Sequence, residues 1–163
     1  MTPEEQLQLV DAINDTLKDP SAEVRKEALH CLLGLGIDGL GRIIDAVDDN
    51  DTSLQCKIEA VEAIGRAFSE GKVDRTRMVK SAVSVLESCL ERENDPLIEA
   101  AIISLGEIGP QAINSKGKLL KLLDAKKDSN RIRVQIGLAM LKISSDIYVK
   151  NYQRFRSGLK QIG

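Results

Sequence analysis

The fold of this chain is decided by the stretch Cys31-Leu32-Leu33-Gly34-Leu35-Gly36, whose pattern returns three times further along the chain. The later copies are Ala63-Ile64-Gly65-Arg66-Ala67-Phe68, Ser104-Leu105-Gly106-Glu107-Ile108-Gly109 and Ala139-Met140-Leu141-Lys142-Ile143-Ser144. The second residues of the four copies lie 32, 41 and 35 residues apart. Such spacing is typical of stacked repeats that contain one helical hairpin each, with the variation in length absorbed by loops.

Aligned columns around these copies predict which face of each helix is buried. Four residues before the second position stand Ala28, Ala60, Ala101 and Ile136, and eight residues before it stand Val24, Cys56, Leu97 and Ile132. The residue directly before it is small in every copy: Cys31, Ala63, Ser104 and Ala139. Apolar residues at this spacing form one buried helical stripe, and small residues beside it allow a neighbouring helix to approach closely. We therefore expect all of these columns to be buried.

Each of these helices is preceded by another amphipathic segment. The first is expected from Pro3 to Lys18, with Thr2 as its cap, because Glu4 and Glu5 favour the positive end of the helix dipole. The others are expected from Asp38 to Asp48, from Asp74 to Arg92, and around the leucines at 119, 120, 122 and 123. A final unpaired helix is expected to begin near Ser145.

The columns resemble HEAT repeats, most closely the short HEAT-like repeats first noted in phycobilisome lyase proteins. The motifs that carry the resemblance are Asp19-Pro20, Val24-Arg25 and Leu35-Gly36 in the first repeat, Asp51 and Lys57 in the second, Asp95-Pro96 in the third and Arg133 in the fourth. The second repeat departs by ending in Ala67-Phe68, the third by placing Ile98 where a basic residue is usual, and the fourth by ending in Ser144.

The resemblance implies an all-α, right-handed α-α superhelix in which residues 1–163 form a single domain. Its repeats would span about 3–36, 38–69, 74–109 and 110–144, followed by a terminal helix at 145–163. It also implies that Asp19 with Arg25, and Asp51 with Lys57, belong to a polar ladder that ties neighbouring repeats together, which Ile98 interrupts.

Composition restricts the class of protein further. Aromatic residues make up 2% of the chain, so the core must be aliphatic. No run of about 18 apolar residues is present, so no membrane span is expected. The acidic, polar amino terminus does not resemble a secretory signal, and three cysteines without metal-ligand spacing indicate free thiols in a reducing, cytoplasmic location.

Charge is distributed unevenly along the chain. Residues 1–109 contain 11 lysines and arginines against 22 aspartates and glutamates, a net charge of −11. Residues 110–163 contain 12 basic against 3 acidic residues, a net charge of +9. In a stack of repeats this order places an acidic end opposite a basic end. Three interpretations remain open: simple solubility, an anionic partner at the basic end, or head-to-tail contact between molecules.

Two short motifs that suggest chemistry have a simpler structural interpretation. The pattern Gly34-Leu35-Gly36-Ile37-Asp38-Gly39 satisfies G-x-G-x-x-G, but a dinucleotide site requires a strand before it, and a helix is expected here. His30 is the single histidine and adjoins Cys31, but consecutive helical residues point about 100° apart and do not form a nucleophile–base pair. We therefore expect no enzymatic activity, no metal and no cofactor.

The exposed face of the second helices is the best candidate for binding, because inner helices line the concave groove of such stacks. We expect a protein or peptide partner on this face, and the candidate residues are Glu27, His30, Glu59, Glu62, Arg66, Ile103, Glu107, Gln135, Leu138 and Lys142. Ile103 and Leu138 are apolar in an otherwise polar column, so they either anchor the partner or pack on adjoining helices.

The basic carboxyl-terminal part offers an alternative function. It predicts binding of nucleic acid or another polyanion, with Lys118, Lys121, Lys126, Lys127, Arg131, Lys150, Arg154 and Arg156 as candidates. The stripe of Tyr148, Tyr152 and Phe155 is expected to seal the last repeat as a capping helix. A further alternative, a lyase- or chaperone-like factor for a cofactor-bearing protein, follows from the family resemblance alone.

Overall fold

The structure of the protein, a computed structural model, describes the backbone of residues 1–71 and 75–160 and the side chains of residues 1–71 and 78–145. This part of the chain is all-helical and contains no β-strand. Its elements are α1 (Pro3–Asp15), η1 (Thr16–Lys18), α2 (Ala22–Gly34), α3 (Ile37–Asp48), α4 (Leu54–Ser69), α5 (Arg75–Leu90), α6 (Asp95–Ile108), η2 (Gly109–Ser115), α7 (Lys116–Ala125) and α8 (Asn130–Lys160).

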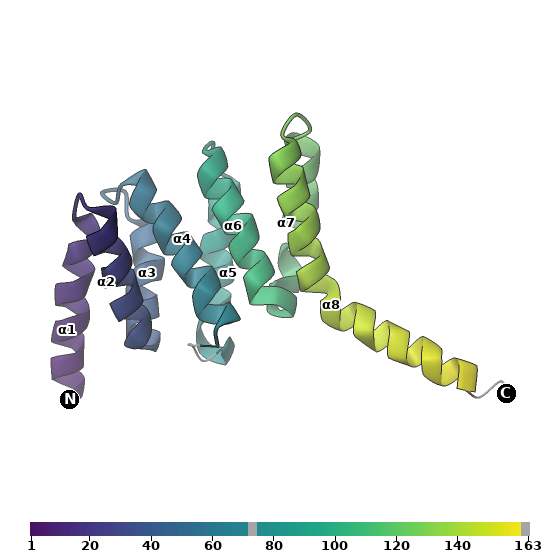
Figure 1. Cartoon of the computed structure of the whole chain (residues 1–163), viewed down its shortest axis with the longest axis horizontal. Helices are drawn as coiled ribbons and strands as arrows, with labels where there is room; N and C mark the ends of the chain where they lie inside the picture. Colours follow the sequence, from purple (N-terminus) through teal and green to yellow (C-terminus); the bar gives the residue numbers. More distant parts are fainter. Residues whose placement is uncertain (72–74, 161–163) are drawn as a thin grey trace.

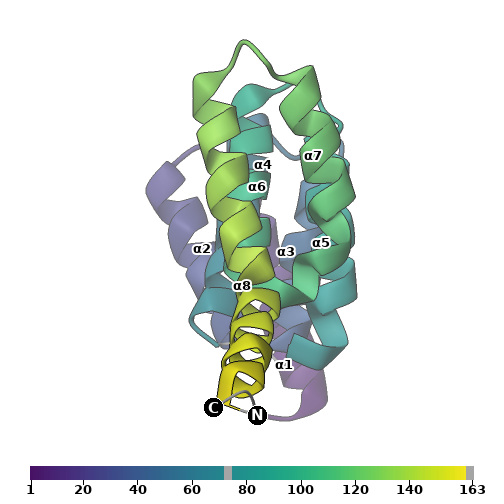
Figure 2. The same cartoon turned by 90° about the vertical axis from the view of Figure 1, so that its right-hand side faces the viewer.

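The helices are arranged in two layers that follow the order of the sequence. Helices α2, α4, α6 and the first part of α8 lie side by side in one layer, and α1, α3, α5 and α7 lie behind them (Figure 1). The view along the row shows the two layers next to each other, with α8 in front of α6 and α4 (Figure 2). Each even-numbered helix therefore packs on the helix before it and on its even-numbered neighbours.

Side-chain caps start three of the even-numbered helices. Ser21, Ser53 and Asn94 each accept a hydrogen bond from the backbone N–H three residues later, at the starts of α2, α4 and α6. Thr2 caps α1 in the same way, and Glu5 completes a reciprocal capping box. These bonds satisfy N–H groups that have no partner within the helix. The expected first, second and third outer helices are confirmed to within a few residues as α1 with η1, α3 and α5.

Two glycines reverse the chain between layers. Gly36 and Gly109 have φ values of 74° and 73°, a left-handed conformation that side chains disfavour. After the first of them, Gly39 lies so close to α2 that an added Cβ would be 1.9 Å from the carbonyl oxygen of Leu32. The G-x-G-x-x-G pattern is therefore a tight connection between two helices, and a helix, not a strand, precedes it.

Small residues allow the even-numbered helices to pack closely. A Cβ added to Gly65 of α4 would lie 2.7 Å from Oγ of Ser104 on α6, and one added to Gly106 of α6 would lie 3.1 Å from Cα of Ala139 on α8. The Ser104 hydroxyl donates a 2.8 Å hydrogen bond to the carbonyl of Val61 across the same contact. The small-residue column of the sequence thus faces the preceding even-numbered helix.

The predicted core columns are buried in α4, α6 and α8, except for the half-buried Met140 of α8, and two members in α2 are exposed. Val24 is 40% exposed and Cys31 is also exposed. The reason is positional: these columns face the preceding even-numbered helix, and α2 has none before it. The rest of the core is aliphatic around Phe68, as the composition predicts.

The expected separate helix beginning near Ser145 is wrong, because α8 runs without interruption from Asn130 to Lys160. Beyond the row its backbone extends away from α7 and does not fold back over it (Figure 1). The side chains of Tyr148, Tyr152 and Phe155 lie outside the described residues, so the expected aromatic cap is not described. Among the described residues, no helix combines the length and apolar character needed to cross a bilayer.

Replacing Gly39 with alanine is expected to lower the free energy of unfolding by about 1–3 kcal/mol, because the new methyl group would overlap the backbone of Leu32. The matched control is Gly41→Ala in the same helix, where a Cβ meets nothing within 4 Å. This control should be neutral or stabilise by about 0.5–1 kcal/mol through helix propensity. Urea denaturation followed by circular dichroism measures both changes, and equal effects at the two glycines would contradict the close approach.

Candidate functional site

The exposed surface of α2, α4, α6 and α8, called the even-helix face below, contains most of the expected binding residues. The exposed members are Glu27, His30, Glu62, Arg66, Ile103, Leu138 and Lys142, and the half-buried ones are Glu107 and Gln135. Glu59 differs, because it is only 3% exposed. Its expected exposure on this face is therefore wrong, because its carboxylate is enclosed between α2 and α4.

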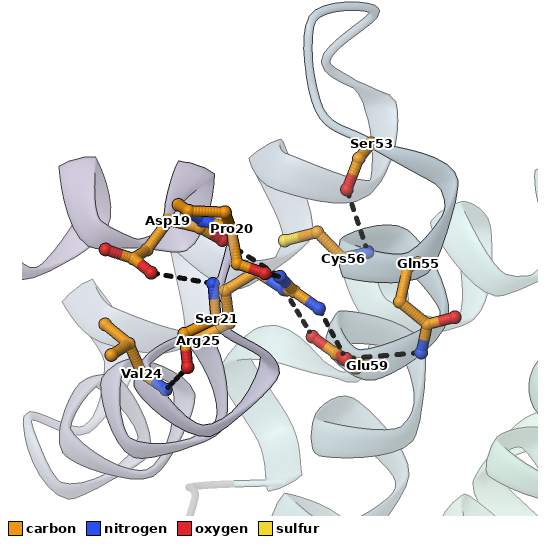
Figure 3. A network of polar contacts seen from close by, with 9 residues as sticks. All are labelled: Asp19, Pro20, Ser21, Val24, Arg25, Ser53, Gln55, Cys56 and Glu59. Atoms are coloured by element: carbon orange, nitrogen blue, oxygen red, sulfur yellow. Dashed lines mark hydrogen bonds and ion pairs between the residues drawn. The ribbon is translucent and has the colours of Figure 1, made fainter.

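Glu59 instead forms a buried ion pair with Arg25 of α2. The Arg25 Nε and Nη2 atoms donate hydrogen bonds of 2.8 and 2.9 Å to the two carboxylate oxygens of Glu59 (Figure 3). Gln55 donates a third bond of 3.2 Å to the same carboxylate. The planar guanidinium matches a carboxylate in two parallel bonds, the strongest form of this pair. Arg25 thus joins α2 to α4.

The other end of the guanidinium holds the loop before α2. Arg25 Nη1 donates hydrogen bonds of 2.9 Å to the backbone carbonyls of Asp19 and Pro20 (Figure 3). The Asp19 carboxylate accepts a bond from the backbone N–H of Ser21 instead. The expected link between Asp19 and Arg25 therefore runs through the main-chain carbonyl of Asp19. The carboxylate that pairs with Arg25 is that of Glu59 on α4, 34 residues later in the chain.

Sequence reasoning missed Glu59 because it treated the column as exposed. The available signal was its position directly before Ala60, at the edge of the buried stripe. Burial acts to raise the pKa of Glu59, but the hydrogen bonds from Arg25 and Gln55 outweigh it and hold the pKa below its usual value. The hydrogen bond to Glu59 in turn raises the pKa of Arg25. Both groups therefore carry their charges at neutral pH.

Breaking this pair should destabilise the fold strongly. Arg25→Met leaves the Glu59 carboxylate buried without its partner, and we expect a loss of about 3–5 kcal/mol in the free energy of unfolding. The measurement is urea denaturation at neutral pH, with Lys26→Met on the exposed side of α2 as the control.

The same pair predicts a pH dependence of stability. Because the folded pKa of Glu59 is lowered, its contribution is present above the unfolded value of about 4.3 and is lost as the pH falls through the folded value. In Glu59→Gln, the decline in stability on acidification should be shallower than in the wild type. An identical decline would show that Glu59 has the same pKa in both states.

A hollow of about 370 Å³ lies on the even-helix face between α4, α6 and α8. Its apolar wall is formed by Ile58, Pro96, Ala100, Ile103 and Ile132. Glu62, Asp95, Glu99, Ser129 and Arg131 complete its rim. Ile103 is 42% exposed there, and Leu138 of α8, which is not part of the lining, is 50% exposed. The structure therefore leaves both apolar residues in contact with solvent, and adjoining helices do not cover them.

Ion pairs flank this apolar surface and join α6 to the elements after it. Arg131 Nε lies 2.6 Å from Glu99 Oε1, and Lys126 Nζ lies 2.5 Å from Asp95 Oδ1. Lys142 pairs with Glu107 further along the two helices. Among the described residues of the rim, Glu62 has no ion-pair partner. The hollow thus has one uncompensated carboxylate beside an apolar wall.

Most of the described basic residues proposed for anion binding already have carboxylate partners. Lys118 lies 3.2 Å from both Glu87 and Glu91, whose hydrogen bonds raise its pKa. Lys126 and Arg131 pair with acids of α6, as given above, and Lys121 and Lys127 are exposed. The side chains of Lys150, Arg154 and Arg156 lie outside the described residues. The acidic third repeat therefore neutralises much of the described basic charge after residue 110.

His30 and the three cysteines differ in their exposure. His30 and Cys31 are both exposed on α2, and Cys56 and Cys89 are buried apart from them. Within the described part of the chain, no three of its histidines, cysteines, aspartates and glutamates gather in a way that holds a metal ion. Burial raises the pKa of the Cys56 thiol and raises that of Cys89 to about 11, which disfavours their reactive thiolates.

Cys31 should therefore react far faster than the other two thiols. In the native protein at mildly alkaline pH, we expect one thiol to be alkylated rapidly by iodoacetamide, and peptide mass spectrometry should locate it at Cys31. Unfolding in urea should make all three equally reactive. Rapid native labelling of Cys89 would contradict its burial between α5 and the core.

Comparison with known proteins identifies no relative. No protein-family model matches the chain, and no curated protein matches it.

Proposed function

We propose that this chain is a non-enzymatic binding module, a right-handed HEAT-like superhelix that contacts a protein or peptide partner through its even-helix face. The recurring columns of the sequence, the two-layer arrangement and the close contacts of successive even-numbered helices support this architecture. A row of helices presents side chains of consecutive repeats on one continuous surface, which suits an extended ligand.

The observation that carries the proposal is the solvent exposure of Ile103 beside the hollow between α4, α6 and α8. Large apolar side chains that a partner covers commonly supply most of the free energy of binding. Leu138 extends this apolar surface onto α8, and the ion pairs of Glu99 and Glu107 border it. The arrangement of an apolar centre inside a charged rim is that of a protein-binding surface.

The chemistry of the hollow restricts the partner. Its wall accepts an apolar side chain, and the carboxylate of Glu62 at the rim favours a lysine or arginine next to that side chain. A segment with an apolar residue followed closely by a basic one, in an extended or helical conformation, satisfies both requirements.

Affinity capture with substituted proteins tests this proposal. An Ile103→Glu, Leu138→Glu double variant places two charges on the apolar surface, and proteins bound by the wild type should be recovered at least about tenfold less. Quantitative mass spectrometry of the captured proteins measures the loss. A Glu62→Lys variant should weaken the same interaction.

The matched control is Leu120→Glu, which changes a leucine of similar exposure on α7 in the other layer. Circular dichroism and thermal unfolding should show all variants folded, because each changed side chain is exposed. Loss of the same proteins from Leu120→Glu, or their retention by the double variant, would contradict binding through the even-helix face.

A further inference from the structure

The buried Arg25–Glu59 pair has an incomplete counterpart one repeat later. The aligned columns place Lys57 of α4 in the position of Arg25, and Ala100 of α6 in the position of Glu59. At the following interface the corresponding residues are Ile98 and Gln135, so neither charge is present. The interface between α4 and α6 therefore keeps the cation and lacks the carboxylate.

Lys57 is buried without a bonded partner. It is 7% exposed, and no described residue forms a hydrogen bond or an ion pair with its side-chain ammonium. Among the described residues, every fully buried polar side-chain atom has a hydrogen bond. Because the ammonium of Lys57 has none, it must retain contact with solvent. Hydrogen bonds from the Asp51 backbone and the Thr52 side chain lower the pKa of Asp49, and the nearby charge of Lys57 helps to lower it further.

A hollow of about 430 Å³ lies where Lys57 meets solvent, between the starts of α4 and α6. It is called the Lys57 pocket below, and its lining includes Thr52, Leu54, Lys57, Arg92, Asn94 and Leu97. This pocket is separate from the hollow around Ile103, with which it shares no lining residue.

The residues that line the Lys57 pocket include two cations, Lys57 and Arg92, against one carboxylate, that of Glu93. Arg92 supplies a second cation, held only loosely because its Nη2 atom is 3.9 Å from Asp48 Oδ1. Glu93 lies in the lining, and Asp48 and Asp49 are close to the two cations. A doubly charged phosphate would face these three acids, whereas one carboxylate balances the unpaired ammonium.

We propose that the Lys57 pocket binds a carboxylate group, which pairs with the Lys57 ammonium as Glu59 pairs with the Arg25 guanidinium. The ammonium of Lys57 and the guanidinium of Arg92 donate to the carboxylate oxygens, as charge-assisted hydrogen bonds do. Leu54, which is 45% exposed, and Leu97 contact the aliphatic part of the ligand. The carboxylate comes from a free organic acid or from a polypeptide, as an acidic side chain or a carboxyl terminus.

Heteronuclear NMR of the full chain, at constant ionic strength, tests the site with defined probes. N-acetylleucine presents a terminal carboxylate, N-acetylglutamic acid α-amide presents a side-chain carboxylate, and acetate represents a small free acid. We expect saturable shifts of the amide signals of Thr52, Lys57 and Asn94 with at least one of these probes at tens-of-millimolar concentration. The tightest of the three identifies the source of the carboxylate.

N-acetylleucinamide and inorganic phosphate are the matched controls. The first keeps the apolar group and removes the charge, so it should cause no saturable shift. No response to any of the three carboxylates, or a tighter response to phosphate than to all of them, would overturn the proposal.

Substitutions locate the binding. Lys57→Met keeps the aliphatic stem and removes a charge that has no bonded partner, so the fold should persist while the affinity for the probe falls at least tenfold. Lys80→Met, at an exposed lysine of α5, should bind like the wild type. Unchanged affinity in Lys57→Met would reject the site.

A second variant keeps the test decisive if Lys57→Met fails to fold. Ala100→Glu restores the missing carboxylate within the protein, where it should pair with Lys57 and exclude the probe. The melting temperature of this variant should rise, and probe binding should fall at least tenfold. A folded Ala100→Glu protein that binds the probe with wild-type affinity would contradict the proposal.

Discussion

The close approach of neighbouring even-numbered helices is the constraint on which the rest of the structure depends. Gly65 against Ser104 and Gly106 against Ala139 leave no space for a further carbon atom at two of the interfaces. The residue of α2 that aligns with Gly65 and Gly106 is Leu33. There α2 packs less closely on α4, and the Arg25–Glu59 pair is buried between the two helices. The glycines of α4 and α6 thus permit a closer approach than the leucine of α2 at the same position.

The two positions held by Arg25 and Glu59 at the first interface differ at each later one. With both charges present, between α2 and α4, the pair is buried and satisfied. With only Lys57 present, between α4 and α6, the cation lies beside an open pocket. Without either charge, between α6 and α8, Ile98 is fully buried in the place of the cation. A buried charge is costly unless it is paired, so the position without its carboxylate is the one that can accept an external group.

The change from acidic to basic residues near position 110 has an internal explanation in the structure. Lysines and arginines of α7, α8 and the loop between them pair with glutamates and aspartates of α5, of α6 and of the turn between those two helices. These pairs join the third repeat to the fourth, so the net charges of the two segments partly cancel where they meet. The sequence suggested charged ends because it counts charges along the chain, whereas pairing depends on which side chains face each other across an interface.

The sequence by itself determined most of the helices, the cap of the first and most of the core, because these follow from local spacing: Ala60, Ala101 and Ile136 repeat at the same step and are all buried. The exposure of Ile103 and Leu138 was also predictable as one of two alternatives. Only the tertiary structure decided that Cys31 and Val24 are exposed, because burial of that column requires a preceding helix that α2 does not have. It also decided that Glu59 is internal and that Lys57 is unpaired, since both depend on the residue that stands opposite on another helix, about one repeat away in the chain.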